Sequence, residues 1–272
     1  MKMMSYAENH EDVLLDRLFP EERAGFYIDI GANDPVYHSV TKHFSERGWR
    51  GINVEPGAAD YAKLCADRPR DLNLNVGVSD REGALTFHES PQRPGWSTFS
   101  ADRSTVFADQ AVEHVKRTVP VTTLASLCAR HAPATIDFLK VDVEGHEHAV
   151  IAGGDWSRWR PRAVVVEAND TAAWEPILLA ADYLYATTDG LNRYYLRRED
   201  EALAPRLAAP VSVLDGFVHF GYHSRIEELS RQLAELGEFG PDDLAWLRRM
   251  RRLSRRLPKL ASAAKRVLRL VG

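Results

Sequence analysis

Cysteine is scarce in this sequence: only Cys65 and Cys128 occur among 272 residues. They lie far apart and match no metal-ligand spacing, so a reducing compartment fits best. The first residues lack the apolar core of a signal peptide, and no apolar run approaches the length of a membrane span. We therefore expect a cytoplasmic protein with one sizeable hydrophobic core.

The glycine-rich fingerprint of dinucleotide-binding proteins is also missing. The turn at residues 31–34 reads Gly-Ala-Asn-Asp, without the G-x-G-x-x-G pattern that brings a backbone close to a pyrophosphate. A dinucleotide is therefore less expected than a smaller ligand that contains adenosine. An NAD-dependent oxidoreductase stays open as an alternative.

Positive charge is concentrated at the C-terminus. Residues 241–272 contain ten Lys or Arg and two Asp, whereas the other 240 residues contain 25 basic and 37 acidic side chains. An acidic body with a basic tail indicates that the tail has a separate task.

Strands and helices alternate through the middle of the chain. Ser5 and Glu8 form a capping-box pattern, which predicts a helix that runs from Ser5 to Pro20. The expected strands are 26–30, 51–54, 72–76, 136–141 and 163–167, and the expected helices are 39–48, 57–67, 124–131, 147–152 and 171–181. Strands 183–187 and 192–196 flank Asp189-Gly190 and should form a hairpin. The pattern predicts an α/β fold with a doubly wound sheet of about seven strands, mostly parallel, with an antiparallel final hairpin.

One segment interrupts this alternation. A short strand is expected at 84–88, and a Gly/Pro/Ser-rich loop follows it at 89–105. A loop of this length inside a domain is usually a functional lid or a mobile segment. Trp96, Ser97 and Thr98 could therefore form a lid over a substrate, or belong to an anchored loop.

The C-terminal part is predicted to be helical. Apolar residues recur at helical spacing from Ile226 to Leu236, and a heptad seam runs from Trp246 to Val271, with a kink or break expected at Pro258. We divide the chain into an N-terminal capping helix (1–22), a cofactor-binding domain (23–210) and a C-terminal helical basic extension (211–272).

Acidic and small polar residues follow the ends of successive strands. The first strand leads into residues 29–33, the second ends at Glu55-Pro56, and the third leads into residues 78–80. The carboxyl ends of parallel strands meet at one edge of a sheet, and an acid after the second strand usually holds a ribose. Asp29 could hold an amino-acid group and the 78–80 turn an adenine. The sequence therefore predicts a site for S-adenosylmethionine.

A fourth strand end, at residues 138–147, completes a set of segments that resembles a known protein family. The segments GAND, GWRGINVEP, NVGVSD and IDFLKVDVEGHE together resemble the FkbM-type S-adenosylmethionine-dependent methyltransferases, over roughly residues 5–196. The resemblance implies a class I methyltransferase (Rossmann-like) sheet and an O-methyltransferase that acts on a hydroxyl of a sugar, glycan or glycosylated natural product. Pro35 departs from the family, in which many members carry Gly after GAND.

The resemblance and the strand ends assign the site residues. The expected cofactor-binding residues are Asp29, Gly31, Ala32, Asn33, Ser39, Glu55, Pro56, Val78, Ser79, Asp80 and Asp142. The transferred methyl should face Asp142 and Glu144. Methyl transfer needs a nucleophile whose proton is removed at or before attack, so Asp142, Glu144 or His146 could act as the base. Asp142 and Glu144 could instead cap the helix that begins near His146, and His146 could be a surface histidine.

Metal binding is a minor alternative. Asp142 could share a divalent ion with Glu167 or Asn169 at the next strand end. Such oxygen ligands recur by chance, so we assign no metal ligand. Lys140 is expected to face a neighbouring helix or solvent.

The C-terminal helices suggest partners besides the small-molecule or glycan acceptor. Self-association into a homo-oligomer ranks first, contact with an anionic membrane surface second, and nucleic acid is not expected. A non-catalytic assembly protein with a methyltransferase-like fold is the alternative from a different class.

Overall fold

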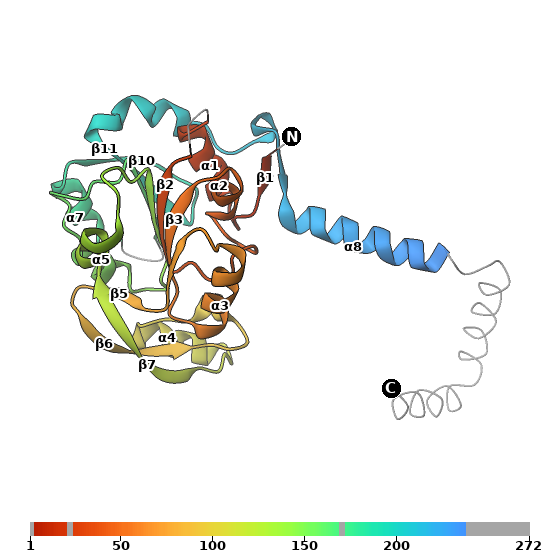
Figure 1. Cartoon of the computed structure of the whole chain (residues 1–272), viewed down its shortest axis with the longest axis horizontal. Coiled ribbons are helices and arrows are strands. Elements are labelled where there is room, and N and C mark those ends of the chain that lie inside the picture. Colours follow the sequence, from red (N-terminus) through yellow and green to blue (C-terminus); the bar gives the residue numbers. More distant parts are fainter. Residues whose placement is uncertain (1–2, 21–23, 169–171, 238–272) are drawn as a thin grey trace. The chain divides into compact units, whose positions relative to one another are not determined.

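The central sheet contains seven strands. The computed structural model describes residues 3–20, 24–168 and 172–237, and the chain divides into two units, Met1–Phe220 and Gly221–Gly272. The strands are β2 (Phe26–Ile30), β3 (Arg50–Val54), β4 (Leu72–Leu74), β8 (Phe138–Val141), β9 (Ala163–Glu167), β10 (Tyr183–Thr188) and β11 (Asn192–Arg197). Their order is β10-β11-β9-β8-β2-β3-β4, and β11 runs antiparallel to both of its neighbours (Figure 1). The predicted mostly parallel sheet with an antiparallel final hairpin is confirmed.

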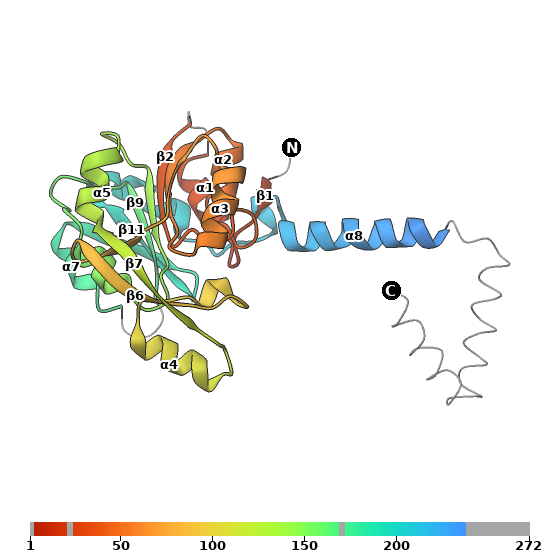
Figure 2. The same ribbon diagram turned by 60° about the horizontal axis from the view of Figure 1, so that its bottom comes forward.

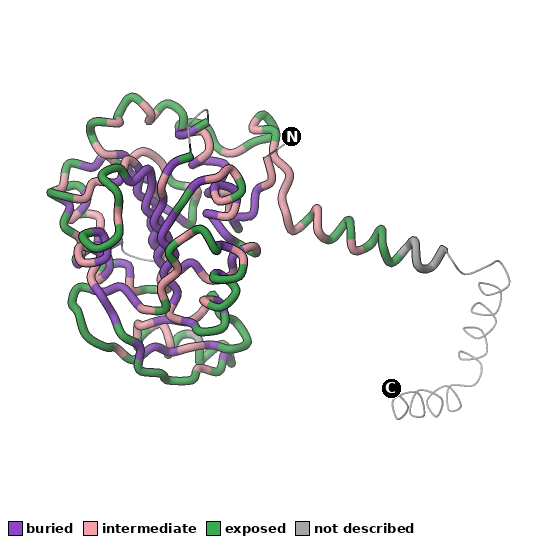
Figure 3. The backbone as a smooth tube through the Cα atoms, viewed as in Figure 1, coloured by how far each residue is buried: buried purple, intermediate pink, exposed green. Residues whose placement is uncertain are grey.

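Helices cover both faces of this sheet. On one face lie α1 (Glu11–Leu18), α2 (Lys42–Glu46) and the 3-10 helix η2 (Arg198–Leu207), and on the other α5 (Leu124–His131), α6 (Glu147–Ala152) and α7 (Glu175–Ala180). Alternate residues of a strand point to opposite faces, so Val164 and Val166 pack in one core and Val165 in the other. The central strands are largely buried (Figure 3), and burial on both faces explains why β9 is apolar up to its last residue, Glu167.

A second, three-stranded sheet follows α3 (Ala58–Asp67). It has the order β5-β7-β6, from β5 (Gly77–Ser79), β6 (Gly83–Glu89) and β7 (Val115–Thr123). The segment between β6 and β7 contains η1 (Pro94–Trp96) and α4 (Ala101–Asp109), as Figure 2 shows. The sequence analysis missed β7 and α4, so the expected loop at 89–105 is partly helical.

The N-terminal prediction needs correction. Residues Met3–Ser5 form β1, which pairs with β12 (Phe217–His219), and α1 begins only at Glu11. Ser5 does not cap a helix: its hydroxyl donates to Asp12 Oδ1 at 2.8 Å, and Asp12 also accepts from the backbone N–H of Tyr6 at 2.7 Å. Strand pairing holds Ser5 extended, which overrides the local capping pattern.

The C-terminal helix α8 spans Phe220–Gly237, after the short η3 (Val213–Asp215). Ile226 and Leu229 on this helix are exposed. The predicted heptad seam from Trp246 to Val271 lies outside the described residues. Among the helices of the described part, none is both long and apolar enough to cross a membrane.

Candidate active site at the carboxyl edge of the sheet

The ends of β2 and β8 touch each other at Gly31. This glycine has φ +81°, and a Cβ on it would lie 1.9 Å from the carbonyl oxygen of Asp142. Only glycine tolerates both the left-handed backbone and this contact. The N–H of Asp142 donates to the carbonyl of Ile30 at 3.1 Å. The glycine turn and the acid after β8 are therefore fixed relative to each other.

Glu55 follows β3 and closes over the same turn. Its carboxylate accepts from the backbone N–H of Asn33 at 2.8 Å and from that of Gly57 at 2.6 Å. Burial is the main reason that the pKa of Glu55 rises to about 7. Each carboxylate oxygen has two lone pairs, so Glu55 can still accept hydrogen bonds from a ligand's hydroxyls.

A largely apolar cavity, here called the apolar cavity, lies beside Glu55. It contains about 540 Å³ free of protein atoms, part of it open to solvent. Its apolar walls include Val54, Pro56, Val76, Val78, Phe87, Phe99 and Val143. The rings of Phe87 and Phe99 are 4.8 Å apart. The apolar walls suit a flat, mostly apolar group such as an adenine.

A second cavity, here called the acidic cavity, adjoins the first. It contains about 1020 Å³ free of protein atoms, part of it open to solvent. The two cavities share Gly31, Asn33, Pro94, Gly95, Asp142 and Glu144. Five carboxylates line the acidic cavity: Glu8, Glu11, Asp142, Glu144 and Glu167. A ligand in one cavity would therefore meet a ligand in the other beside Asp142 and Glu144.

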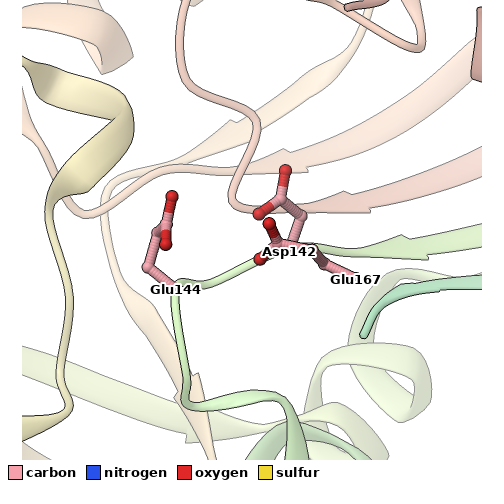
Figure 4. Close-up of side chains that lie close together, drawn as sticks. All are labelled: Asp142, Glu144 and Glu167. Atoms are coloured by element: carbon pink, nitrogen blue, oxygen red, sulfur yellow. The ribbon is translucent and has the colours of Figure 1, made fainter. Parts of the chain in front are cut away.

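Three of these carboxylates converge. One ligand oxygen from each of Asp142, Glu144 and Glu167 lies within 4.8 Å of the others (Figure 4). Oxygen groups at this spacing could hold a divalent cation. Asn169, the other ligand considered from the sequence, lies outside the described residues.

Glu144 has an unusual backbone and a raised pKa. Its φ is +54°, which is uncommon for a residue with a Cβ. Thr98 donates to its carbonyl at 2.7 Å, and Arg103 of α4 pairs with its carboxylate at 3.1 Å. Burial, and then the charge of Asp142, raises the pKa of Glu144 to about 7. These contacts hold its side chain in the wall that both cavities share.

Lys140 does not face a helix surface or solvent, so that expectation is wrong. Its Nζ donates to the carbonyl of Gly31 at 2.7 Å and lies 3.3 Å from Asp29 Oδ1 and 3.4 Å from Asp142 Oδ2. Asp29 and Lys140 are register partners on β2 and β8. Lys140 lines the acidic cavity, and sequence reasoning missed it. The signal was present, because opposite charges occupy the next-to-last positions of two apolar strands.

The predicted cofactor-binding residues fall into two groups. Gly31, Ala32, Asn33, Glu55, Pro56, Val78 and Asp142 line one or both cavities. Asp29, Ser39, Ser79 and Asp80 are not among the described residues that line them. Asp29 and Ser39 instead accept hydrogen bonds from Thr41 and Arg68, at 2.9 and 3.1 Å.

His146 is also not among the described residues that line the two cavities. Its Nε2 lies 3.1 Å from Ser79 Oγ, and its ring is 5.5 Å from that of Phe99, which stands in the cavity wall. Burial lowers the pKa of His146, which favours the neutral ring. Of the three bases considered, the described geometry brings Asp142 and Glu144 together at the cavities.

The segment that carries Trp96 is anchored. Thr98 exchanges backbone hydrogen bonds with His88 at 2.8 and 3.0 Å, and Ser97 Oγ accepts from the N–H of Ser90 at 3.0 Å. Trp96 lines the acidic cavity, with the Arg93 guanidinium 4.6 Å from its ring centroid. These hydrogen bonds fix the segment in place as one wall of the site, which agrees with the prediction of an anchored loop.

Comparisons with known proteins point to one family. Residues 29–185 match the model of the methyltransferase FkbM domain. Methyltransferase sdnD of Sordaria araneosa is 28% identical over 183 residues, which are 56% of this chain and 67% of that protein. The domain match includes the ends of β2, β3, β8 and β9, which line the cavities.

Two solved structures are distantly similar to this chain. A TehB-like SAM-dependent methyltransferase from Corynebacterium glutamicum is 9% identical with a TM-score of 0.40, over 69% of this chain and 87% of that one. Precorrin-6y C5,15-methyltransferase from Geobacter metallireducens is 14% identical with a TM-score of 0.35, over 70% of this chain and 89% of that one.

The buried carboxyl groups predict how stability depends on pH. Burial is the main reason that the pKa rises to about 7 for Glu11, Glu55 and Glu144 and to about 6 for Asp12. In the unfolded chain these groups titrate near about 4, so between about pH 4 and 7 the folded protein binds more protons. This stabilisation is complete below about pH 4 and declines as the pH rises, and the part that remains at pH 6 is lost as the pH rises through 7. We expect the unfolding midpoint to fall by about 2–5 °C between pH 6 and pH 8.

Differential scanning fluorimetry at constant ionic strength measures this difference. Glu55→Gln removes one of the four groups, so the change between the two pH values should be smaller in this variant. A wild-type midpoint that is equal at both pH values, or higher at pH 8, would contradict the burial of these carboxyl groups.

Proposed function

Because the chain belongs to the family of FkbM-domain methyltransferases, we propose that it transfers a methyl group from S-adenosylmethionine to a hydroxyl of a sugar, glycan or glycosylated natural product. The observation that supports this most is the pair of adjoining cavities, one apolar and one rich in carboxylates. They meet at Asp142 and Glu144, where a hydroxyl and a methyl donor would have to come together.

The residues of the apolar cavity fit the nucleoside of this cofactor. Val78, Phe87 and Phe99 offer apolar walls for the adenine, and Glu55 offers acceptor oxygens for the two ribose hydroxyls. The ionised carboxylate of Glu55 is a better hydrogen-bond acceptor than its protonated form. When bound, S-adenosylmethionine supplies the methyl group on a sulfonium, whose positive charge the nearby Asp142 would offset.

The acidic cavity fits a polyhydroxylated acceptor. Trp96 gives one wall an aromatic ring, on which the apolar face of a sugar can pack, and the carboxylates accept hydrogen bonds from hydroxyls. A general base works best when its pKa lies near the operating pH. Glu144, with a pKa of about 7, is therefore the proposed base.

Two further proposals concern location and assembly. Cys65 and Cys128 are free thiols, which supports a reducing, cytoplasmic location. Ile226 and Leu229 are 62% and 41% exposed on α8, at a spacing of three residues. We propose that this apolar stripe associates with a second copy of the chain.

Cofactor binding is tested at Glu55. Glu55→Gln removes the negative charge while keeping one acceptor, so the Kd of S-adenosylhomocysteine should rise about 10- to 100-fold in calorimetry. Glu199→Gln is the matched control, because Glu199 is an exposed carboxylate that pairs with Arg160 at 2.9 Å and is not among the cavity residues; its Kd should match wild type. Unchanged affinity in Glu55→Gln would show that Glu55 does not hold the ribose.

The reaction is tested with a panel of free sugars and glycosides. Mass spectrometry should locate the new methyl on an oxygen, and Glu144→Gln should lower kcat by about 100-fold or more if Glu144 is the base. A methyl found on nitrogen or sulfur would overturn the proposed O-methylation. Parallel reactions with a chelator test whether the three-carboxylate cluster holds a metal ion. A metal-dependent enzyme would lose activity when the chelator removes the ion.

Self-association is tested on α8. Ile226→Glu places a charge in the proposed contact and should lower the mass measured by light scattering to that of a monomer. Gln232→Glu, an exposed polar position on the same helix, is the control. A wild-type protein that is monomeric at all concentrations would exclude this interface.

A further inference from the structure

The acidic cavity contains one deeply placed positive charge. The Lys140 side chain is only 10% exposed, yet the residue contributes to the cavity lining. Its ammonium has three N–H donors, and among the described residues only the contact with the Gly31 carbonyl, at 2.7 Å, is a close hydrogen bond. The contacts with Asp29 and Asp142 are longer, at 3.3 and 3.4 Å. Each of the three donors therefore has an oxygen nearby, and the contact with Asp142, whose side chain is 40% exposed, is the one that a ligand can replace.

The charge of the cavity decides where an anion can bind. Among the described lining residues, five are carboxylates, whereas the fixed cations are Lys140 and Arg93. His38 lies 3.1 Å from Glu8 and is engaged there. An anionic group that enters this cavity would be repelled by most of the wall, so it must lie against one of the two cations.

Burial selects between these cations. If the ribose lies at Glu55, the amino-acid chain of the cofactor enters the acidic cavity along the shared wall, which includes Gly31 and also Pro94 and Gly95. Lys140 Nζ is in contact with Gly31, and Arg93 precedes Pro94, so both cations lie beside this passage. Arg93 is exposed and stacks on Trp96, whereas the Lys140 side chain is only 10% exposed and is fixed by three contacts. Lys140 is therefore the cation that is held in place for the carboxylate.

We infer that Lys140 binds the α-carboxylate of S-adenosylmethionine, and that Asp142, its partner in an ion pair, receives the α-ammonium group. Lys140 offers a positive charge and Asp142 a negative charge. They match the carboxylate and the ammonium group, which the cofactor carries on one carbon atom. Asp29 is buried behind Lys140 and keeps a counter-charge there when Asp142 turns toward the ligand. The inference rests on the proposed binding of S-adenosylmethionine.

Calorimetry with two ligands tests this role without any acceptor. S-adenosylhomocysteine has the amino-acid group, whereas 5′-methylthioadenosine has the same nucleoside and a thioether without it. Lys140→Met should raise the Kd of S-adenosylhomocysteine about 10- to 100-fold and change that of 5′-methylthioadenosine less than about threefold. Asp29→Asn/Lys140→Met, which leaves no buried Asp29 charge unpaired, should show the same selective loss if the single variant fails to fold.

Lys42→Met is the matched control. Lys42 forms an ion pair with Asp67 at 2.8 Å, its side chain is 15% exposed, and it is not among the cavity residues. This variant should bind both ligands as wild type does.

Three results would overturn the inference: unchanged binding of both ligands, equal weakening of both, or selective loss in Arg93→Met instead of Lys140→Met. Equal weakening would assign Lys140 a purely structural role and leave the proposed cofactor intact. If wild type bound neither ligand, the proposed function itself would fail.

Discussion

Two opposite charges buried side by side organise this active site. Asp29 and Lys140 lie on neighbouring parallel strands, and Lys140 also reaches the carbonyl of Gly31. Removing an ion pair from water costs free energy, and loss of one partner leaves an uncompensated charge. The pair therefore constrains both residues and, through them, the glycine turn. Asp142 is positioned by the same lysine and by its backbone contact with Gly31.

A buried hydrogen-bond network continues from this pair into the loop after β2. Asp29 accepts from Thr41, and Arg68, with a fully buried side chain, donates to Thr41, to Ser39 and to the carbonyl of Pro35. Charged groups hydrogen-bonded in a low-dielectric interior hold their geometry strongly. These hydrogen bonds fix the loop that forms one wall of the acidic cavity, although Asp29 itself does not line the cavity.

The sequence predicted the central sheet well, because strands buried on both faces have continuous apolar runs. Phe26–Ile30 and Ala163–Glu167 match β2 and β9 at both ends, and the strand-end acids Glu55 and Asp142 do line the cavities. The failures have tertiary causes. Ser5 is drawn into a strand by residues more than 200 positions away, and β7 forms only because β5 and β6 pair with it. The acidic wall at Glu8 and Glu11 arises from folding and has no local motif.

The shared wall of the two cavities limits how the site can be altered. Pro94 and Gly95 face both cavities, and the segment that follows them is held through Thr98 to the carbonyl of Glu144. A larger side chain at Gly95 would project into this common boundary. The two chambers therefore cannot be redesigned separately from this side of the site.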